Sequence, residues 1–256
     1  MEMTFDEYIQ NPMGVANAVI SNRVMYRNLY TQKLDFILVR EAGNIEYHLY
    51  KKNDNYIAYL KIPSEVVDKF YYDVLIEFRP PKKAITGTTL KDYYVRFYSN
   101  DPSFVFTFTH AFIANKIFIT ELSDKMSKKA IKEKAKEKNP KDQVGYVKSL
   151  YFAYLIMSKR GLFNKVKYME KYNDIAVKNM IMPADQKIEL RIEAQEKIAK
   201  QKKKAKAEVK RQMDDFMQKE LPTQLVTPKR GIKTVGKVKA ISGNKKTNTI
   251  KTVKKR

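Results

Sequence analysis

The sequence contains no cysteine, and this absence removes several classes of protein at once. Without thiols the chain can form no disulfide framework, no cysteine-based zinc site and no thiol nucleophile. The composition fits a reducing compartment, or a protein that does not need an oxidising one. Apolar runs are also short: the longest, such as FVFTFTHAFIA, stay well below the length of about 18 residues that a membrane span needs. The acidic opening MEMTFDEYIQ lacks the basic and apolar regions of a signal peptide.

Side chains suited to catalysis are scarce. Only two histidines occur, His48 in a strand-like segment and His110 at the end of an aromatic one. Neither has carboxylates or a second ligand at the short spacing that catalysis or metal binding needs, so both are interpreted as structural. The sequence has no phosphate-binding loop, dinucleotide fingerprint or nucleophile elbow. It therefore predicts no enzyme, no cofactor, and no catalytic or metal-ligating residue.

Acidic residues are lacking where basic residues are most abundant. The net charge is +23, of which residues 1–120 contribute +1, residues 121–182 contribute +8 and residues 183–256 contribute +14. The last 36 residues contain no Asp or Glu. A nearly neutral first half followed by an increasingly basic second half is typical of a folded body that carries a basic arm.

Alternating aromatic and β-branched residues in the first half predict a sheet. Residues 45–51 and 56–62 flank the polar turn KNDN, which is a hairpin signal. Residues 71–79, 91–99 and 103–109 also alternate and are separated by proline-containing turns. These five segments predict a mostly antiparallel sheet of four or five strands. Helices that cover one face of it would make the fold α+β.

Helical patterns lie on both sides of these strands. Thr4 is a candidate N-cap for a short helix that carries Asp6 and Glu7 in its first turn, where negative charge suits the helix dipole. Apolar spacing predicts a helix over 21–41, in which FILV could instead be a strand. A further apolar run predicts a helix over 111–122 on the sheet.

The second half of the chain is expected to be helical. Residues 123–142 are rich in Lys and poor in apolar side chains, which indicates a linker or a solvated helix end. Residues 143–182 predict two helices, with Gly161 as the C-cap between them. Strong helix formers over 183–221, with proline at the first position, predict one long helix with a basic centre.

The predicted fold class is α+β: a mostly antiparallel four- or five-stranded sheet with helices, then a helical region, a long basic helix and an extended basic arm. The predicted segments are an α+β body (1–122), a Lys-rich linker (123–142), a helical region (143–182), the long basic helix (183–221) and the arm (222–256).

The long helix and the arm carry the candidate binding residues. Lysines without nearby acids gain most by neutralising phosphates and releasing counterions, in contacts that do not depend on base sequence. An acidic protein surface is an alternative partner for the arm, whereas a membrane is disfavoured because the arm has no amphipathic aromatic face. The predicted nucleic-acid-binding residues are Lys200, Lys202, Lys203, Lys204, Lys206, Lys229, Arg230, Lys233, Lys237, Lys239, Lys245, Lys246, Lys251, Lys254, Lys255 and Arg256.

Tyrosines are concentrated in the predicted strands. They could form a stacking platform for single-stranded nucleic acid, with Tyr94 and Tyr98 as test positions. They could also reflect the preference of tyrosine for strands. Because the sheet region is nearly neutral and has no ribonucleoprotein signature, the structural interpretation is favoured.

Two stretches have a recognisable character, TFDEYIQNPMGVANAVISNRVMYRNLYTQKLDFILVREAG and YYVRFYSNDPSFVFTFTHAF. Together with the basic arm they resemble tailed-bacteriophage virion proteins from low-GC hosts. The resemblance covers residues 4–112 and implies a non-enzymatic, multi-copy structural or assembly protein, built into a virion in the host cytoplasm. The basic helix and arm would then anchor it to nucleic acid or to neighbouring subunits. The alternative is a cytoplasmic RNA- or ribosome-binding factor.

Overall fold

The molecule is described by a computed structural model. It covers residues 2–10, 31–36, 38, 45–82, 89–164 and 169–220. Within the described ranges, no helix combines the length and the apolar character needed to cross a membrane.

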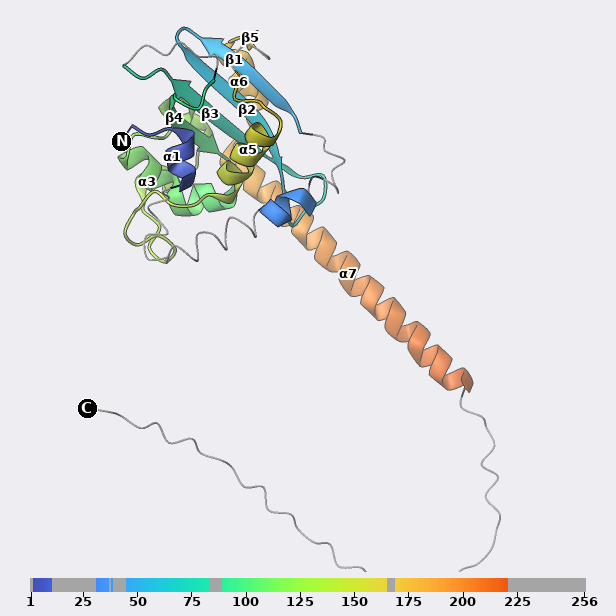
Figure 1. Cartoon of the computed structure of the whole chain (residues 1–256). Coiled ribbons are helices and arrows are strands. Elements are labelled where there is room, and N and C mark those ends of the chain that lie inside the picture. The colour runs from blue at the N-terminus through green and yellow to red at the C-terminus, as the bar shows by residue number, and fades with distance from the viewer. Residues whose placement is uncertain are drawn as a thin grey trace, which may run out of the picture. The chain divides into compact units, whose positions relative to one another are not determined.

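The chain divides into two compact units, Met1–Ala205 and Lys206–Arg256. The first unit contains the sheet and the helices that pack on it (Figure 1). The predicted arm over 222–256 lies outside the described residues. So does most of the predicted helix over 21–41, of which residues 31–36 and 38 are described and are helical.

Five strands form one sheet in the order β4-β3-β2-β1-β5 (Figure 1). Their bounds are β1 (Tyr47–Lys52), β2 (Asn55–Pro63), β3 (Tyr71–Arg79), β4 (Tyr94–Ser99) and β5 (Met169–Lys171). Strands β1 to β4 pair as antiparallel neighbours, and β5 pairs in parallel with the β1 edge. The predicted α+β class with a mostly antiparallel sheet is confirmed, including the hairpin between β1 and β2.

The fifth strand is not the one that the sequence predicts. Residues 103–109, predicted as a strand, form the π-helix η2 (Phe104–Phe108) and the start of α3 (Thr109–Ala114). Instead β5 completes the sheet, although its residues lie in the region predicted to be helical. The pairing of β5 with β1 is a long-range contact that local apolar spacing does not encode.

Asp101 explains why the chain turns into a helix directly after β4. Its carboxylate Oδ1 accepts a hydrogen bond from the backbone N–H of Ser103 at 2.9 Å, and its carbonyl accepts one from the N–H of Val105 at 2.9 Å. Phe104 and Val105 are both buried, although adjacent residues of a strand would point to opposite faces. The strand predicted from the alternating Phe residues is therefore wrong.

The remaining helices include several short ones and one long one. Their bounds are α1 (Phe5–Gln10), the 3-10 helix η3 (Thr120–Lys125), α4 (Lys128–Lys132), α5 (Lys148–Lys159), α6 (Asp174–Met180) and α7 (Ala184–Glu220). The long helix predicted over 183–221 is confirmed as α7. The helix predicted over 111–122 is shorter, because α3 ends at Ala114.

Two helix ends have the caps that the sequence predicts. At the start of α1, the hydroxyl of Thr4 accepts from the N–H of Glu7 at 3.2 Å, and the Glu7 carboxylate accepts from the N–H of Thr4 at 2.7 Å. This reciprocal pair is a capping box. After α5, Gly161 has a φ of 65°, the left-handed conformation that favours glycine.

Helices cover both faces of the sheet, rather than the single face predicted. On one face, the ring of Phe97 packs on Phe5 of α1 at 5.1 Å and on Phe112 of α3 at 6.0 Å between centroids. On the other face, Tyr98 donates to the carbonyl of Lys125 in η3 at 3.1 Å, and Tyr50 contacts Met180 of α6. The sheet is therefore the middle layer of the first unit.

A buried carboxylate holds the start of α7 against the sheet. Asp73 of β3 accepts hydrogen bonds from the hydroxyl of Tyr59 at 2.9 Å and from the side-chain amide of Asn100 at 2.7 Å. It also accepts one from the backbone N–H of Met182 at 3.2 Å. Because Met182 lies two residues before α7, this network fixes where the helix leaves the sheet.

Candidate nucleic-acid interface

The centre of α7 presents the lysines that the sequence predicts as a binding site. Lys200, Lys202, Lys203 and Lys204 are exposed on the last helical turns of the first unit, and Lys206 is exposed on the same helix just after the unit boundary. In the part of the chain that the structure describes, none of them forms an ion pair. We call these five residues the Lys-rich segment.

The predicted site residues of the arm lie outside the described residues. They are Lys229, Arg230, Lys233, Lys237, Lys239, Lys245, Lys246, Lys251, Lys254, Lys255 and Arg256.

The strand tyrosines are not an open stacking platform. Tyr59 and Tyr98 are fully buried, and burial is the largest cause that raises the pKa of both phenols. Tyr98 lies under η3, where its hydroxyl donates to the Lys125 carbonyl. Tyr94 is only partly exposed. These rings therefore serve the core, as the favoured interpretation of the sequence expects.

Both histidines pair with carboxylates. Nδ1 of His48 lies 3.1 Å from Glu170 on β5, and Nδ1 of His110 lies 2.6 Å from Asp142. His110 lines neither of the two cavities that adjoin Phe106. Among the described residues, no group of three or more metal-ligating side chains comes together. The visible effect of both pairs is to join segments that are distant in the sequence.

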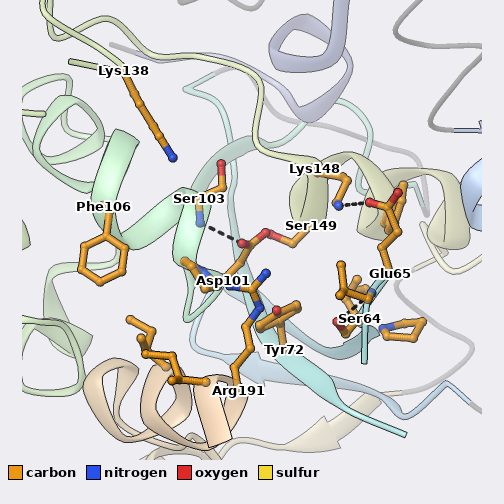
Figure 2. A pocket seen from close by; sticks show the side chains of 17 residues that line it. Ser64, Glu65, Tyr72, Asp101, Ser103, Phe106, Lys138, Lys148, Ser149 and Arg191 are labelled. Atoms are coloured by element: carbon orange, nitrogen blue, oxygen red, sulfur yellow. Dashed lines mark hydrogen bonds and ion pairs between the residues drawn. The ribbon is translucent and has the colours of Figure 1, made fainter. Parts of the chain in front are cut away.

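A pocket of about 500 Å³ opens where the end of β2, the first turn of α5, η2 and the first turns of α7 meet (Figure 2). Figure 2 shows Phe106 and Lys138 on one side of it, the Lys148–Glu65 ion pair on the other, and Arg191 reaching in from α7. The volume falls in the range of about 300–1,000 Å³ that is usual for ligand pockets.

The charges inside this pocket are only partly balanced. Glu65 pairs with Lys148 and, at 2.7 Å, with Lys33. Burial alone would raise the pKa of Glu65, but the two lysines outweigh it and the pKa is lowered. In the described chain Lys138 has no carboxylate partner, and Nε of Arg191 has no hydrogen-bond acceptor. Lys138 is therefore an exposed cationic group without a carboxylate partner in the described chain, whereas Arg191 hydrogen-bonds Tyr72 and its Nε is enclosed.

The side chain of Tyr72 lines the pocket and lies beside Arg191 (Figure 2). Burial, and then the charge of Asp101, raise the pKa of Tyr72, while Arg191 and Ser64 partly offset them. The phenol is therefore protonated at neutral pH and can donate a hydrogen bond, but it supplies no base.

A second hollow of about 380 Å³ lies beside the pocket and shares two residues with it, Phe106 and Lys138. Its other lining residues come from α4 and the segment after it: Lys129, Ala130, Glu133, Lys134, Ala135, Lys136 and Glu137. We call the pocket and the hollow together the Phe106 groove. It lies within the first unit.

Sequence reasoning predicts the Lys-rich segment but misses the Phe106 groove. The alternating pattern places Phe106 in a strand, where it would share a face with two other Phe residues of the core. The π-helix instead buries Phe104 and leaves Phe106 54% exposed.

Comparisons of the chain with protein-family models, with curated proteins and with solved structures found no match.

Proposed function

We propose that this chain is a non-enzymatic structural or assembly protein that anchors to nucleic acid through the Lys-rich segment and the arm that follows α7. The observation that carries the proposal is the set of exposed lysines on α7 without ion-pair partners in the described chain. Residues 197–211 contain eight Lys or Arg and one acidic residue. Such a concentration of positive charge favours nucleic-acid binding, because the ammonium groups replace the counterions condensed on the phosphates and release them.

The contacts would be to the phosphate backbone and independent of base sequence. A lysine ammonium is a point charge on a flexible stem, so it positions a nucleic acid rather than reading base edges. Lysines on several sides of one helix suit this role better than lysines confined to one face of it, because the nucleic acid can then bind the helix from more than one direction. The resemblance to tailed-phage virion proteins leads us to propose a virion as the particle.

Charge-removing and charge-keeping variants of the Lys-rich segment test the proposal. Replacing all five lysines by Gln keeps the helix propensity of α7 but removes five charges. We expect this variant to bind a duplex about ten-fold or more weakly at moderate salt, whereas the matched Lys→Arg variant retains its affinity. Fluorescence anisotropy with a labelled duplex measures both. Equal binding by the wild type and the Gln variant would contradict the proposal.

A second set of exposed residues favours contact between subunits. Val209, Met213, Phe216 and Met217 are 56–64% exposed and recur at helical spacing, so they form one apolar stripe on α7. We infer that a second copy of the chain covers this stripe in an antiparallel helix pair. Lys210 and Asp214 flank the stripe on the same side, and antiparallel pairing brings Lys210 of one copy close to Asp214 of the other.

A further inference from the structure

Phe106 is a large aromatic side chain that the fold leaves on the surface between two cavities. Its ring is 54% exposed and lines both the pocket of about 500 Å³ and the hollow of about 380 Å³. Its neighbours Val105 and Thr107 are buried, so the backbone that carries the ring is fixed by the core. The π-helix there is the kind of local distortion that is frequent at functional sites.

Cationic side chains line the two cavities that Phe106 also lines. Lys129, Lys134 and Lys136 line the hollow, Lys138 lies between the two cavities, and Arg191 lines the pocket. No ion pair in the described chain involves any of them. The carboxylates of the groove reduce its net charge: Glu65, Asp101, Glu133 and Glu137.

A buried amide, that of Asn139, ties the segment that follows Lys138 to η2. The Nδ2 of Asn139 donates to the carbonyl of Thr107 in η2 at 3.2 Å and to the carbonyl of Gln143 at 2.8 Å, and its Oδ1 accepts from the Gln143 N–H at 3.0 Å. The contact between His110 and Asp142 joins the same segment to α3. Because Thr107 directly follows Phe106 and Lys138 directly precedes Asn139, the hydrogen bond from Asn139 to Thr107 fixes the backbone of Lys138 near that of Phe106.

We propose that the Phe106 groove binds single-stranded nucleic acid, with a base stacked on Phe106 and phosphates beside Lys138 and Arg191. This inference rests on the proposed nucleic-acid function and adds a strand preference to it. An exposed ring flanked by unpaired cations provides both contacts that single strands use, because every unpaired base offers a π-face. In a duplex those faces are covered by neighbouring bases, so the ring contributes nothing.

The first test uses the absence of tryptophan from the chain. Phe106→Trp introduces a single tryptophan into the groove, and Phe36→Trp places one at another exposed Phe, which is 70% exposed and outside the groove. We expect an oligothymidine of about 20 nucleotides to quench the tryptophan emission of the Phe106→Trp variant through stacking. Quenching equal to that of the Phe36→Trp control, or none, would overturn the proposal.

The second test compares two affinities of the full chain. Phe106→Ala is expected to weaken oligothymidine binding at least about five-fold and to leave duplex binding unchanged, since one stacked base is lost. The salt slope should stay the same, because no phosphate contact is removed. Phe36→Ala is the matched control, and circular dichroism confirms that both variants fold. An unchanged oligothymidine affinity, or an equal loss for single strand and duplex, would overturn the proposal.

These results separate the groove from the Lys-rich segment. If the proposed function is wrong, the Lys→Gln variant of α7 retains its duplex affinity. If only the groove is wrong, that variant loses duplex affinity while Phe106→Ala changes nothing. Repeating the titration with oligouridine shows whether the groove accepts RNA as well as DNA, since stacking itself is tolerant of the sugar.

Discussion

At the residue scale, the stability of the core depends on Asp73, a buried residue. Both of its carboxylate oxygens accept hydrogen bonds inside the core. Asp73→Ala leaves the hydroxyl of Tyr59 and the backbone N–H of Met182 without their acceptor, and leaves the Asn100 amide with only the Met182 carbonyl, at 3.2 Å. We expect the free energy of unfolding to fall by about 3 kcal/mol or more, since each buried unpaired donor costs about 1–3 kcal/mol. Urea denaturation measures this loss as a lower midpoint.

An exposed aspartate provides the control for Asp73. Asp92 lies on the surface between β3 and β4, and Asp92→Ala is expected to change the free energy of unfolding by less than about 0.5 kcal/mol. Similar losses for the two variants would mean that the Asp73 network does not hold the core together.

Buried phenols make the stability of the fold depend on alkaline pH. Burial is the largest cause that raises the pKa of the buried Tyr8, Tyr59 and Tyr98, and of the partly buried Tyr172, above the ordinary value of 10.0. The folded chain keeps these protons at a pH where the unfolded chain releases them. Their contribution to stability is therefore fully present below about pH 10 and is lost as the pH rises through the higher folded values.

An absorbance titration measures this effect. We expect the phenolate absorbance of the folded protein to develop at higher pH than that of the urea-unfolded chain, and the free energy of unfolding to fall above about pH 10. If folded and unfolded chains titrate together, the tyrosines are not buried as the structure has them.

At the element scale, a substitution at Gly161 measures the free energy that a left-handed backbone conformation costs a residue other than glycine. A Cβ added there would have no heavy atom within 4 Å, so any effect of Gly161→Ala comes from the φ of 65° alone. We expect the free energy of unfolding to fall by about 1 kcal/mol. Gly161→Asn should lose less, because Asn tolerates this conformation better. An Ala variant as stable as the wild type would contradict the left-handed cap after α5.

The elements that could be predicted are those whose signal is local. The Thr4 cap, the turn between β1 and β2, and the uninterrupted helix formers of α7 each lie within one short stretch of sequence. The errors fall where distant residues decide. Residues 103–109 alternate like a strand, but the Asp101 hydrogen bonds turn the chain into η2. Likewise, β5 forms by parallel pairing with the edge of β1, which is far from it in the sequence.

The same distinction between local and long-range signals applies to the two candidate binding sites. The Lys-rich segment could be predicted because charge density along a helix is read directly from the sequence. The Phe106 groove could not, because it joins η2, the Lys138 segment and the start of α7, which are far apart in the chain. No pattern in the sequence predicts the hydrogen bond from Asn139 to Thr107, which brings the Lys138 segment close to Phe106.

At the scale of the whole molecule, the apolar stripe of α7 predicts self-association. Replacing Met213 and Phe216 by Ser should weaken self-association about ten-fold or more, because the native Met and Phe side chains would be buried in the helix pair. Sedimentation over a range of protein concentrations measures the change. Ile175→Ser, at a 72% exposed position of α6, is the control and should change nothing. Equal association of all three proteins would exclude the stripe as the contact.

We propose that the basic C-terminal region of the chain binds phosphates. The most direct test is the salt dependence of duplex binding by the full chain and by a chain that ends at Pro222. Each phosphate contact contributes about −0.9 to the slope of log affinity against log salt. We predict a steep slope for the full chain, which becomes several units shallower on truncation and shallower again when the Lys-rich segment is changed to Gln. A slope near zero for the full chain, or equal slopes for all three, would contradict the account.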